Sequence, residues 1–206
     1  MKKILATLAA AILMSTAAFA QTGIGGGLTM SLDTYDNGKP VISNGFFGGF
    51  SLMLPIYQNI SLVPGAYYSY LTKEDVTSFG PISGTLTVEE HYITIPLYLK
   101  FTVPVSQNFS VFVTGGPRFA AGIISSTSGK GTVSGLLPTD VDIDNYKDDD
   151  TYSRYDLQLG AGGGIELLRN IQLQVTYNWG MLNKYIGDAG VIRKRNVLEL
   201  SASFYF

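Results

Sequence analysis

The chain has 206 residues, a formal net charge of −2 and no cysteine. This length suits a single domain, and the nearly balanced charge gives no overall field that would favour nucleic acid. The missing cysteine excludes both a disulfide framework and a lipid-anchored cysteine. No apolar run of about 18 or more residues follows Gln21, so a transmembrane helix is not expected.

The first twenty residues have the composition of an export signal. A basic start at Lys2 and Lys3 precedes an apolar stretch over residues 4–14, and Ala18-Phe19-Ala20 has the small residues of a cleavage site. This order is typical of a secretory signal peptide. We therefore expect a signal peptide over residues 1–20 and one domain over residues 21–206.

Segments of alternating apolar and polar residues follow one another along the rest of the chain. In residues 171–181, the odd positions are apolar, aromatic or Met, and the even positions are Gln, Thr, Asn or Gly. A period of two suits a strand with one face in lipid and does not suit a helix. Eight such segments are expected, an even number as in single-chain bacterial barrels: 24–32, 46–54, 60–70, 92–103, 109–118, 156–167, 171–181 and 198–206.

The connections between these segments are of two kinds. Short turns at 55–59, 104–108 and 168–170 repeat one hairpin unit, and each contains Asn, which tolerates left-handed backbone geometry. The pattern predicts an all-β fold, an eight-stranded antiparallel up-and-down transmembrane β-barrel with short periplasmic turns and long extracellular loops. A soluble lipocalin-like barrel is the alternative, but its apolar residues would face inward. The expected long polar loops are residues 33–44, 72–85, 125–151 and 183–195.

Charged residues on the polar phase of the strands are candidates for a network inside the barrel. Eight strands leave an interior only wide enough for side chains, and buried charges need partners. We expect these charges to pair and plug the lumen, with Lys100 bound to Glu166 or Glu199; a narrow ion path is the alternative. The residues are Lys100, Arg118, Asp156, Glu166 and Glu199.

A basic cluster, Arg193-Lys194-Arg195, opens the last strand. Phosphates at a membrane surface attract each nearby Lys or Arg by about 1 kcal/mol, and Arg can bind phosphate through two hydrogen bonds. We therefore expect these three residues to contact lipid phosphates of the outer leaflet. Pairing with the acidic run at 140–150 is the alternative.

Catalytic and metal-binding signals are weak. The single histidine, His91, shares the apolar phase of Ile93 and lacks a neighbouring serine with a supporting carboxylate, so we expect a non-catalytic residue at the outer rim and no enzyme activity or cofactor. Asp140, Asp142 and Asp144 have the alternation of a calcium loop, but Thr151 stands where a bidentate Glu is expected. A solvated acidic loop is the main interpretation, with weak calcium binding as the alternative.

Three stretches, residues 92–100, 160–167 and 175–180, are similar to the PorT-like family of small outer-membrane barrels, and more distantly to OmpA/OmpX-type barrels. The ending Phe204-Tyr205-Phe206 resembles the signal that the barrel-assembly machinery reads. The resemblance implies a barrel in the bacterial outer membrane, in contact with outer-membrane lipids, and leaves function open. We expect a non-enzymatic structural or surface-interaction protein that acts through its extracellular loops on an unidentified partner. The alternative is a small pore or an accessory of transport or secretion.

Overall fold

The structure is a computed structural model, and it describes residues 20–35, 40–79, 82–133, 139–144, 153–184 and 192–206. The expected signal peptide over residues 1–20 lies outside these ranges except for Ala20. Within the described ranges, no helix is long and apolar enough to cross a membrane.

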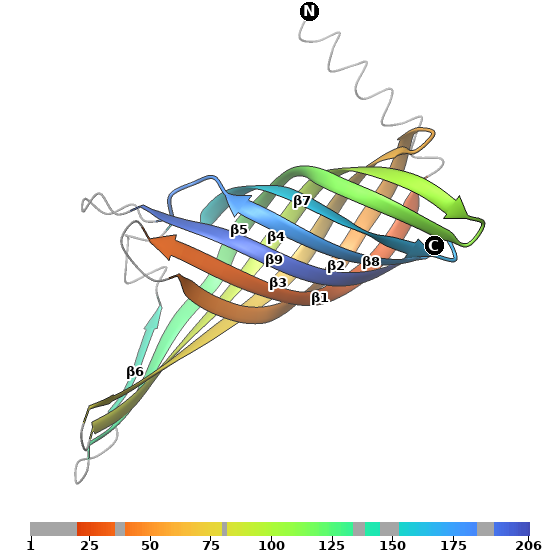
Figure 1. Ribbon diagram of the computed structural model, residues 1–206. Coiled ribbons are helices and arrows are strands. Elements are labelled where there is room, and N and C mark those ends of the chain that lie inside the picture. The colour runs from red at the N-terminus through yellow and green to blue at the C-terminus, as the bar shows by residue number, and fades with distance from the viewer. Residues whose placement is uncertain (1–19, 36–39, 80–81, 134–138, 145–152, 185–191) are drawn as a thin grey trace, which may run out of the picture.

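The chain folds as an antiparallel meander that closes into a ring (Figure 1). Eight of the strands make the ring in the order β1-β2-β3-β4-β5-β7-β8-β9, and β9 pairs with β1. The expected eight-stranded barrel is therefore confirmed, and β6 is an additional strand that pairs with β5 beyond the ring. The strands are β1 (Gln21–Tyr35), β2 (Val41–Tyr57), β3 (Ile60–Phe79), β4 (Ile82–Ser106), β5 (Phe109–Val133), β6 (Thr139–Asp144), β7 (Tyr155–Leu167), β8 (Ile171–Gly180) and β9 (Arg193–Tyr205).

Closure joins the two ends of the barrel sequence. β1 and β9 pair continuously from Gly23↔Tyr205 to Tyr35↔Arg193, and the Phe206 amide donates to the Thr22 carbonyl at 2.9 Å. A closed ring is required in a bilayer because hydrocarbon offers no partner to a backbone N–H or C=O group. The side chains of Phe204 and Phe206 are 49% and 69% exposed, and their role as an assembly signal stays a prediction.

The side chains are distributed in the reverse of a soluble protein. Large apolar side chains point away from the ring, as in Leu28 (65% exposed) and Phe50 (64%), whereas the polar Ser31 and Asn178 are fully buried inside. Strand alternation produces this separation because neighbouring side chains leave a strand on opposite faces. The polar phase expected for the lumen is the phase that the structure turns inward, which excludes the lipocalin-like alternative.

Long parts of two expected loops are instead strands. Residues 72–85 belong to a hairpin in which β3 runs to Phe79 and β4 starts at Ile82, and β5 continues through Ser125 to Val133 before β6 pairs with it. These extensions project beyond one end of the ring (Figure 1). The prediction failed because alternation marks a strand only where one face meets lipid. Beyond the bilayer, backbone pairing continues while both faces can be polar.

The short turns lie at the opposite end of the ring (Figure 1). In the turn at 168–170, the left-handed residues are Leu168 (φ 54°) and Arg169 (φ 65°), so the assignment of that geometry to Asn170 is wrong. Asn170 instead ties the turn to the last strand: its amide Nδ2 donates to the Tyr205 carbonyl at 2.6 Å, and its carbonyl accepts from the Tyr205 amide at 2.8 Å.

The asymmetry between the two ends generates a topology test. A cysteine replacing Glu74, which is exposed on the projecting part of β3, should react in intact cells with a membrane-impermeant maleimide. A cysteine replacing Gln107, exposed in a short turn, should react only after the outer membrane is permeabilised. Labelling of the Gln107 position alone in intact cells would reverse the orientation of the barrel.

Candidate functional site: the charged lumen

Inward-facing charged residues form three clusters along the lumen. The lower cluster is built on Lys100 of β4, whose side chain is 2% exposed. Its Nζ donates to Glu166 Oε2 of β7 at 2.7 Å and lies 4.3 Å from the Phe112 ring centroid. Gln172 Nε2 donates to the same Glu166 oxygen at 2.8 Å. Of the two carboxylates expected to pair with Lys100, Glu166 does so. Glu199 lies in the next cluster.

The middle cluster is centred on Arg118 of β5. Arg118 donates from Nη2 to Glu199 Oε1 of β9 and from Nη1 to Gln158 Oε1 of β7, each at 2.6 Å. Asn178 of β8 donates to the second Glu199 oxygen at 3.3 Å and accepts from the Tyr98 hydroxyl at 2.5 Å. The cluster therefore spans the lumen from β4 to β9, with both carboxylate oxygens of Glu199 hydrogen-bonded.

Asp156 belongs to the middle cluster through Gln158, and none of the ion pairs between described residues includes it. Its Oδ2 accepts from Gln158 Nε2 at 2.8 Å, whereas Oδ1 is buried with no hydrogen-bond partner. A buried unpaired oxygen of this kind costs free energy. Of the five charges expected in the lumen, the structure thus joins four in two pairs and leaves Asp156 bound to an amide.

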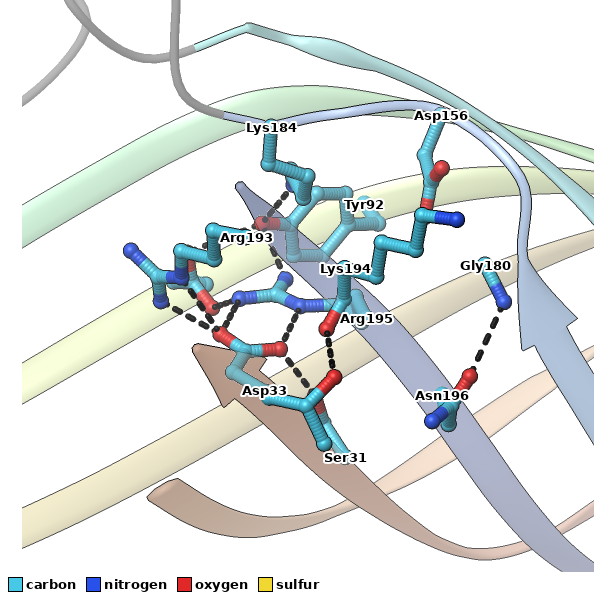
Figure 2. A network of polar contacts seen from close by, with 12 residues as sticks. Ser31, Asp33, Tyr92, Asp156, Gly180, Lys184, Arg193, Lys194, Arg195 and Asn196 are labelled. Atoms are coloured by element: carbon cyan, nitrogen blue, oxygen red, sulfur yellow. Dashed lines mark hydrogen bonds and ion pairs between the residues drawn. The ribbon is translucent and has the colours of Figure 1, made fainter. Parts of the chain in front are cut away.

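The upper cluster lies at the end from which the hairpins project, and Figure 2 shows it at close range. Arg195 of β9 binds Asp33 of β1 through two hydrogen bonds, Nε to Oδ1 at 2.7 Å and Nη2 to Oδ2 at 2.9 Å. The same Nη2 donates to Glu90 Oε2 at 2.7 Å, and Nη1 donates to the Tyr92 hydroxyl. Arg193 also forms an ion pair with Asp33. Two arginines are therefore neutralised by two carboxylates from other strands.

These contacts overturn the expected lipid-phosphate role of Arg193 and Arg195. Arg195 is 3% exposed and points into the lumen, and the Arg193 side chain is 13% exposed on Asp33. Only Lys194 of the three is exposed. The physical reason is strand phase, because Arg193 and Arg195 share the inward face of β9 with Glu199. The alternative partner, the acidic run at 140–150, falls on residues whose side chains are not described.

Sequence reasoning missed four members of the upper cluster: Asp33, Glu90, Tyr92 and Lys184. A signal for three of them was present. Asp33 continues the inward phase of Ser31, and Glu90 and Tyr92 continue the inward phase that leads to Lys100. They were missed because Asp33 was assigned to a loop and because the phase of β4 was not followed beyond Tyr92.

Lys184 enters the upper cluster from the connection after β8. Its Nζ donates to the Tyr92 hydroxyl at 3.1 Å and lies 4.8 Å from the centre of that ring. Its backbone is fixed at both groups, with N–H donating to Arg193 O at 2.8 Å and C=O accepting from the Ser153 amide at 2.9 Å. Burial, reinforced by the charge of Arg195, lowers the pKa of the Lys184 ammonium to about 8.

Cavities lie inside the barrel beside Arg118. One of about 60 Å³ lies below Arg118 and is lined by hydroxyl groups of Ser51, Tyr67, Thr176 and Tyr205. The other, of about 20 Å³, lies between the middle and upper clusters. A water molecule needs about 10–15 Å³ of such space. The larger cavity therefore has room for a few water molecules, and the smaller cavity has room for one. Side chains of the middle and upper clusters cross the lumen on either side of the smaller cavity.

The candidate metal and catalytic residues lie apart from the lumen. Asp140, Asp142 and Asp144 are on β6, where they pair in register with Lys130, Ser128 and Ser126. In the described part of the chain, no group of three or more His, Asp or Glu side chains could hold a metal ion. His91 is partly buried outside the barrel, where its Nδ1 hydrogen-bonds the Tyr68 hydroxyl and its ring centre lies 5.1 Å from that of Tyr70.

A closed antiparallel ring with an apolar outer belt and paired charges inside defines a transmembrane β-barrel. The sequence of residues 16–185 matches the model of a family described as outer membrane protein beta-barrel domain. The chain belongs to this family and is a protein of the bacterial outer membrane.

Solved structures of low sequence identity are similar to most of this chain. Ail of Yersinia pestis, solved with the heparin analogue sucrose octasulfate, is 14% identical with a TM-score of 0.46, over 91% of this chain and 99% of that one. Neisserial surface protein A is 13% identical with a TM-score of 0.45, over 90% and 97%. OprG from Pseudomonas aeruginosa is 9% identical with a TM-score of 0.45, over 91% and 96%. No curated protein matches the chain.

The lower cluster generates a stability test. Lys100→Met leaves the Glu166 carboxylate buried without its cation, so the unfolding free energy should fall by about 3–5 kcal/mol. Lys100→Met/Glu166→Gln should recover part of that loss, because the uncompensated charge is removed. Unfolding in detergent, followed by the shift in electrophoretic mobility on heating, measures both. Exposed Lys194→Met is the control, and strictly additive losses would mean that Lys100 and Glu166 do not interact.

The buried Lys184 generates a pH test. Its pKa falls from 10.5 in the unfolded chain to about 8 in the folded protein. Between these values the unfolded state binds more protons, so the Lys184 contribution to the unfolding free energy rises with pH. The stability of the wild type minus that of Lys184→Met should therefore increase from pH 8 toward pH 10. A difference that stays constant over this interval would show that Lys184 titrates alike in both states.

Proposed function

We propose that the protein is a non-enzymatic outer-membrane barrel that acts at the cell surface through its projecting hairpins. The observation that carries this proposal is the continuation of β3, β4 and β5 beyond the ring, where β6 joins them in one four-stranded sheet. Such a sheet offers a paired and therefore ordered platform, unlike a flexible loop. The partner that we propose for this sheet is an extracellular or envelope molecule.

The clusters that cross the lumen support a surface role over a pore. The middle cluster crosses the barrel through Arg118, Glu199 and Asn178, and the upper cluster crosses it again through Arg195 and Glu90. An ion would have to separate charge-assisted hydrogen bonds at both levels, and these are the strong ones. A small pore, or an accessory to transport or secretion, remains the second candidate. The two cavities support this second candidate, since both provide open space inside the barrel.

The similarity of residues 92–100, 160–167 and 175–180 to PorT-like sequences supports a place in that branch of small barrels. In the same proposal, residues 1–20 are an export signal that is removed, Phe204 and Phe206 engage the barrel-assembly machinery, and the outer belt contacts outer-membrane lipids.

Planar-bilayer recording and site-specific cross-linking test the surface role together. The purified barrel should give no steady openings, whereas regular conductance steps would favour the pore. A photo-cross-linking residue at Leu86, which is 48% exposed on the projecting part of β4, should form adducts with surface macromolecules in intact cells. Val105, 61% exposed near a short turn, is the matched control. Equal adduct patterns at both positions would contradict a surface-interaction role for the hairpins.

A further inference from the structure

Three prolines interrupt the barrel wall on neighbouring strands. Pro64 lies on β3, Pro96 on β4 and Pro117 on β5, and proline has no N–H group to donate to a strand ladder. In the β2–β3 ladder, pairing stops after Ser51↔Gly65 and resumes only at Leu54↔Leu62. The interval contains Pro64, so this part of the wall lacks regular pairing in the middle of both strands.

The next two ladders are interrupted in the same way. Between β3 and β4 the pairing stops at Pro64↔Leu97 and resumes at Tyr67↔Thr94, an interval that contains Pro96. Between β4 and β5 it stops at Pro96↔Arg118 and resumes at Leu99↔Gly115, an interval that contains Pro117. We call this diagonal line of three gaps the proline seam. The other ladders of the ring run without such a proline-centred gap over their described residues.

The β2 end of the proline seam lies between a cavity inside the barrel and a hollow outside it. Inside, the seam borders the 60 Å³ cavity, which is lined by Val63, Pro96 and Ser51. Outside, a hollow of about 340 Å³ lies between Phe50, Leu52 and Pro64, and Ser51 also lines it. One residue therefore faces both the lumen cavity and the outer hollow. Its hydroxyl is held on the lumen side by a 2.9 Å hydrogen bond with the Tyr205 hydroxyl.

The outer hollow has an apolar lining with uneven relief. Phe50 and Leu52, 64% and 42% exposed, stand on β2 as part of the lipid-facing belt. On β3 the outward-facing neighbour is the small Ala66, which leaves space beside those large side chains. Gly65 faces the lumen, where a Cβ would lie 2.6 Å from Tyr67 Cε2, so it contributes only backbone to the hollow. The belt is therefore indented at this place.

We propose that this hollow is a binding site for one acyl chain of a membrane phospholipid. It is continuous with the surface that the bilayer covers, and its walls offer apolar contact and almost no polar group. A chain lodged between Phe50 and Ala66 makes contacts on several sides, where a chain against a convex belt makes contact on one. Dispersion contacts are individually small and add up with their number, so the indented position holds a lipid longer. The bound chain covers part of the wall where regular strand pairing is interrupted.

The test fills or widens the hollow and measures lipid retention. The wild type, purified in mild detergent with phospholipid, should keep one phospholipid in native mass spectrometry. A phospholipid with a photoreactive acyl chain should label the β2 segment that contains Phe50 and Leu52. Ala66→Leu should weaken retention about tenfold, as expected when about two methylene groups lose their apolar contacts. Ala161→Leu is the control, because Ala161 is also a small exposed residue on the belt, on β7.

A second pair of variants keeps the proposal testable if Ala66→Leu assembles poorly. Phe50→Ala removes one wall of the hollow and should also reduce retention and labelling, whereas Phe119→Ala removes an aromatic residue of similar exposure (52%) elsewhere on the belt. Equal retention in each variant and its control would overturn the proposal. So would photolabelling spread evenly around the barrel. Either result would leave the surface role of the hairpins unaffected.

Discussion

The structure depends on one constraint, the need to satisfy every backbone hydrogen-bonding group within a bilayer. A sheet meets that need only by closing on itself, and closure fixes which face of each strand is inside. Once the faces are fixed, alternation assigns Leu28 and Phe50 to lipid and Ser31 and Asn178 to the interior. Closure therefore decides which strand positions are polar and which are apolar, because the same sheet left open would have no enclosed face.

Inside the barrel, ion pairs connect strands that are not neighbours. Lys100 joins β4 to β7 through Glu166, and Arg118 joins β5 to β9 through Glu199. Arg195 joins β9 to β4 through Glu90. Ion pairs of this kind compensate for their own desolvation more than they add net stability. Their geometric effect is different, since each pair fixes the distance across the lumen and so opposes flattening of the ring.

The fold was accessible from the sequence wherever one strand face meets lipid. Residues 171–181 and 198–206 show the alternation clearly, and the ring placed both as expected. The extended hairpin at 72–85 was not accessible, because polar residues on both faces remove the period of two while the backbone still pairs. The inward turn of Arg193 and Arg195 could have been derived by continuing the phase of Glu199 for three more inward positions. The position of Lys184 in the lumen could not have been derived from the sequence. Lys184 lies in a connection between strands, and such a segment has no periodic pattern that predicts its path.

The pairing of β1 with β9 has a consequence for the order of events in folding. It brings Gly23 beside Tyr205, positions near the two ends of the domain sequence, so the ring can close only after the last strand is available. Contacts between such distant residues slow folding, because the chain loses loop entropy before they form. Until then, β1 and β9 each expose an edge that can pair with another chain. The interval between synthesis of the first strand and arrival of the last is therefore when the protein is most vulnerable to aggregation.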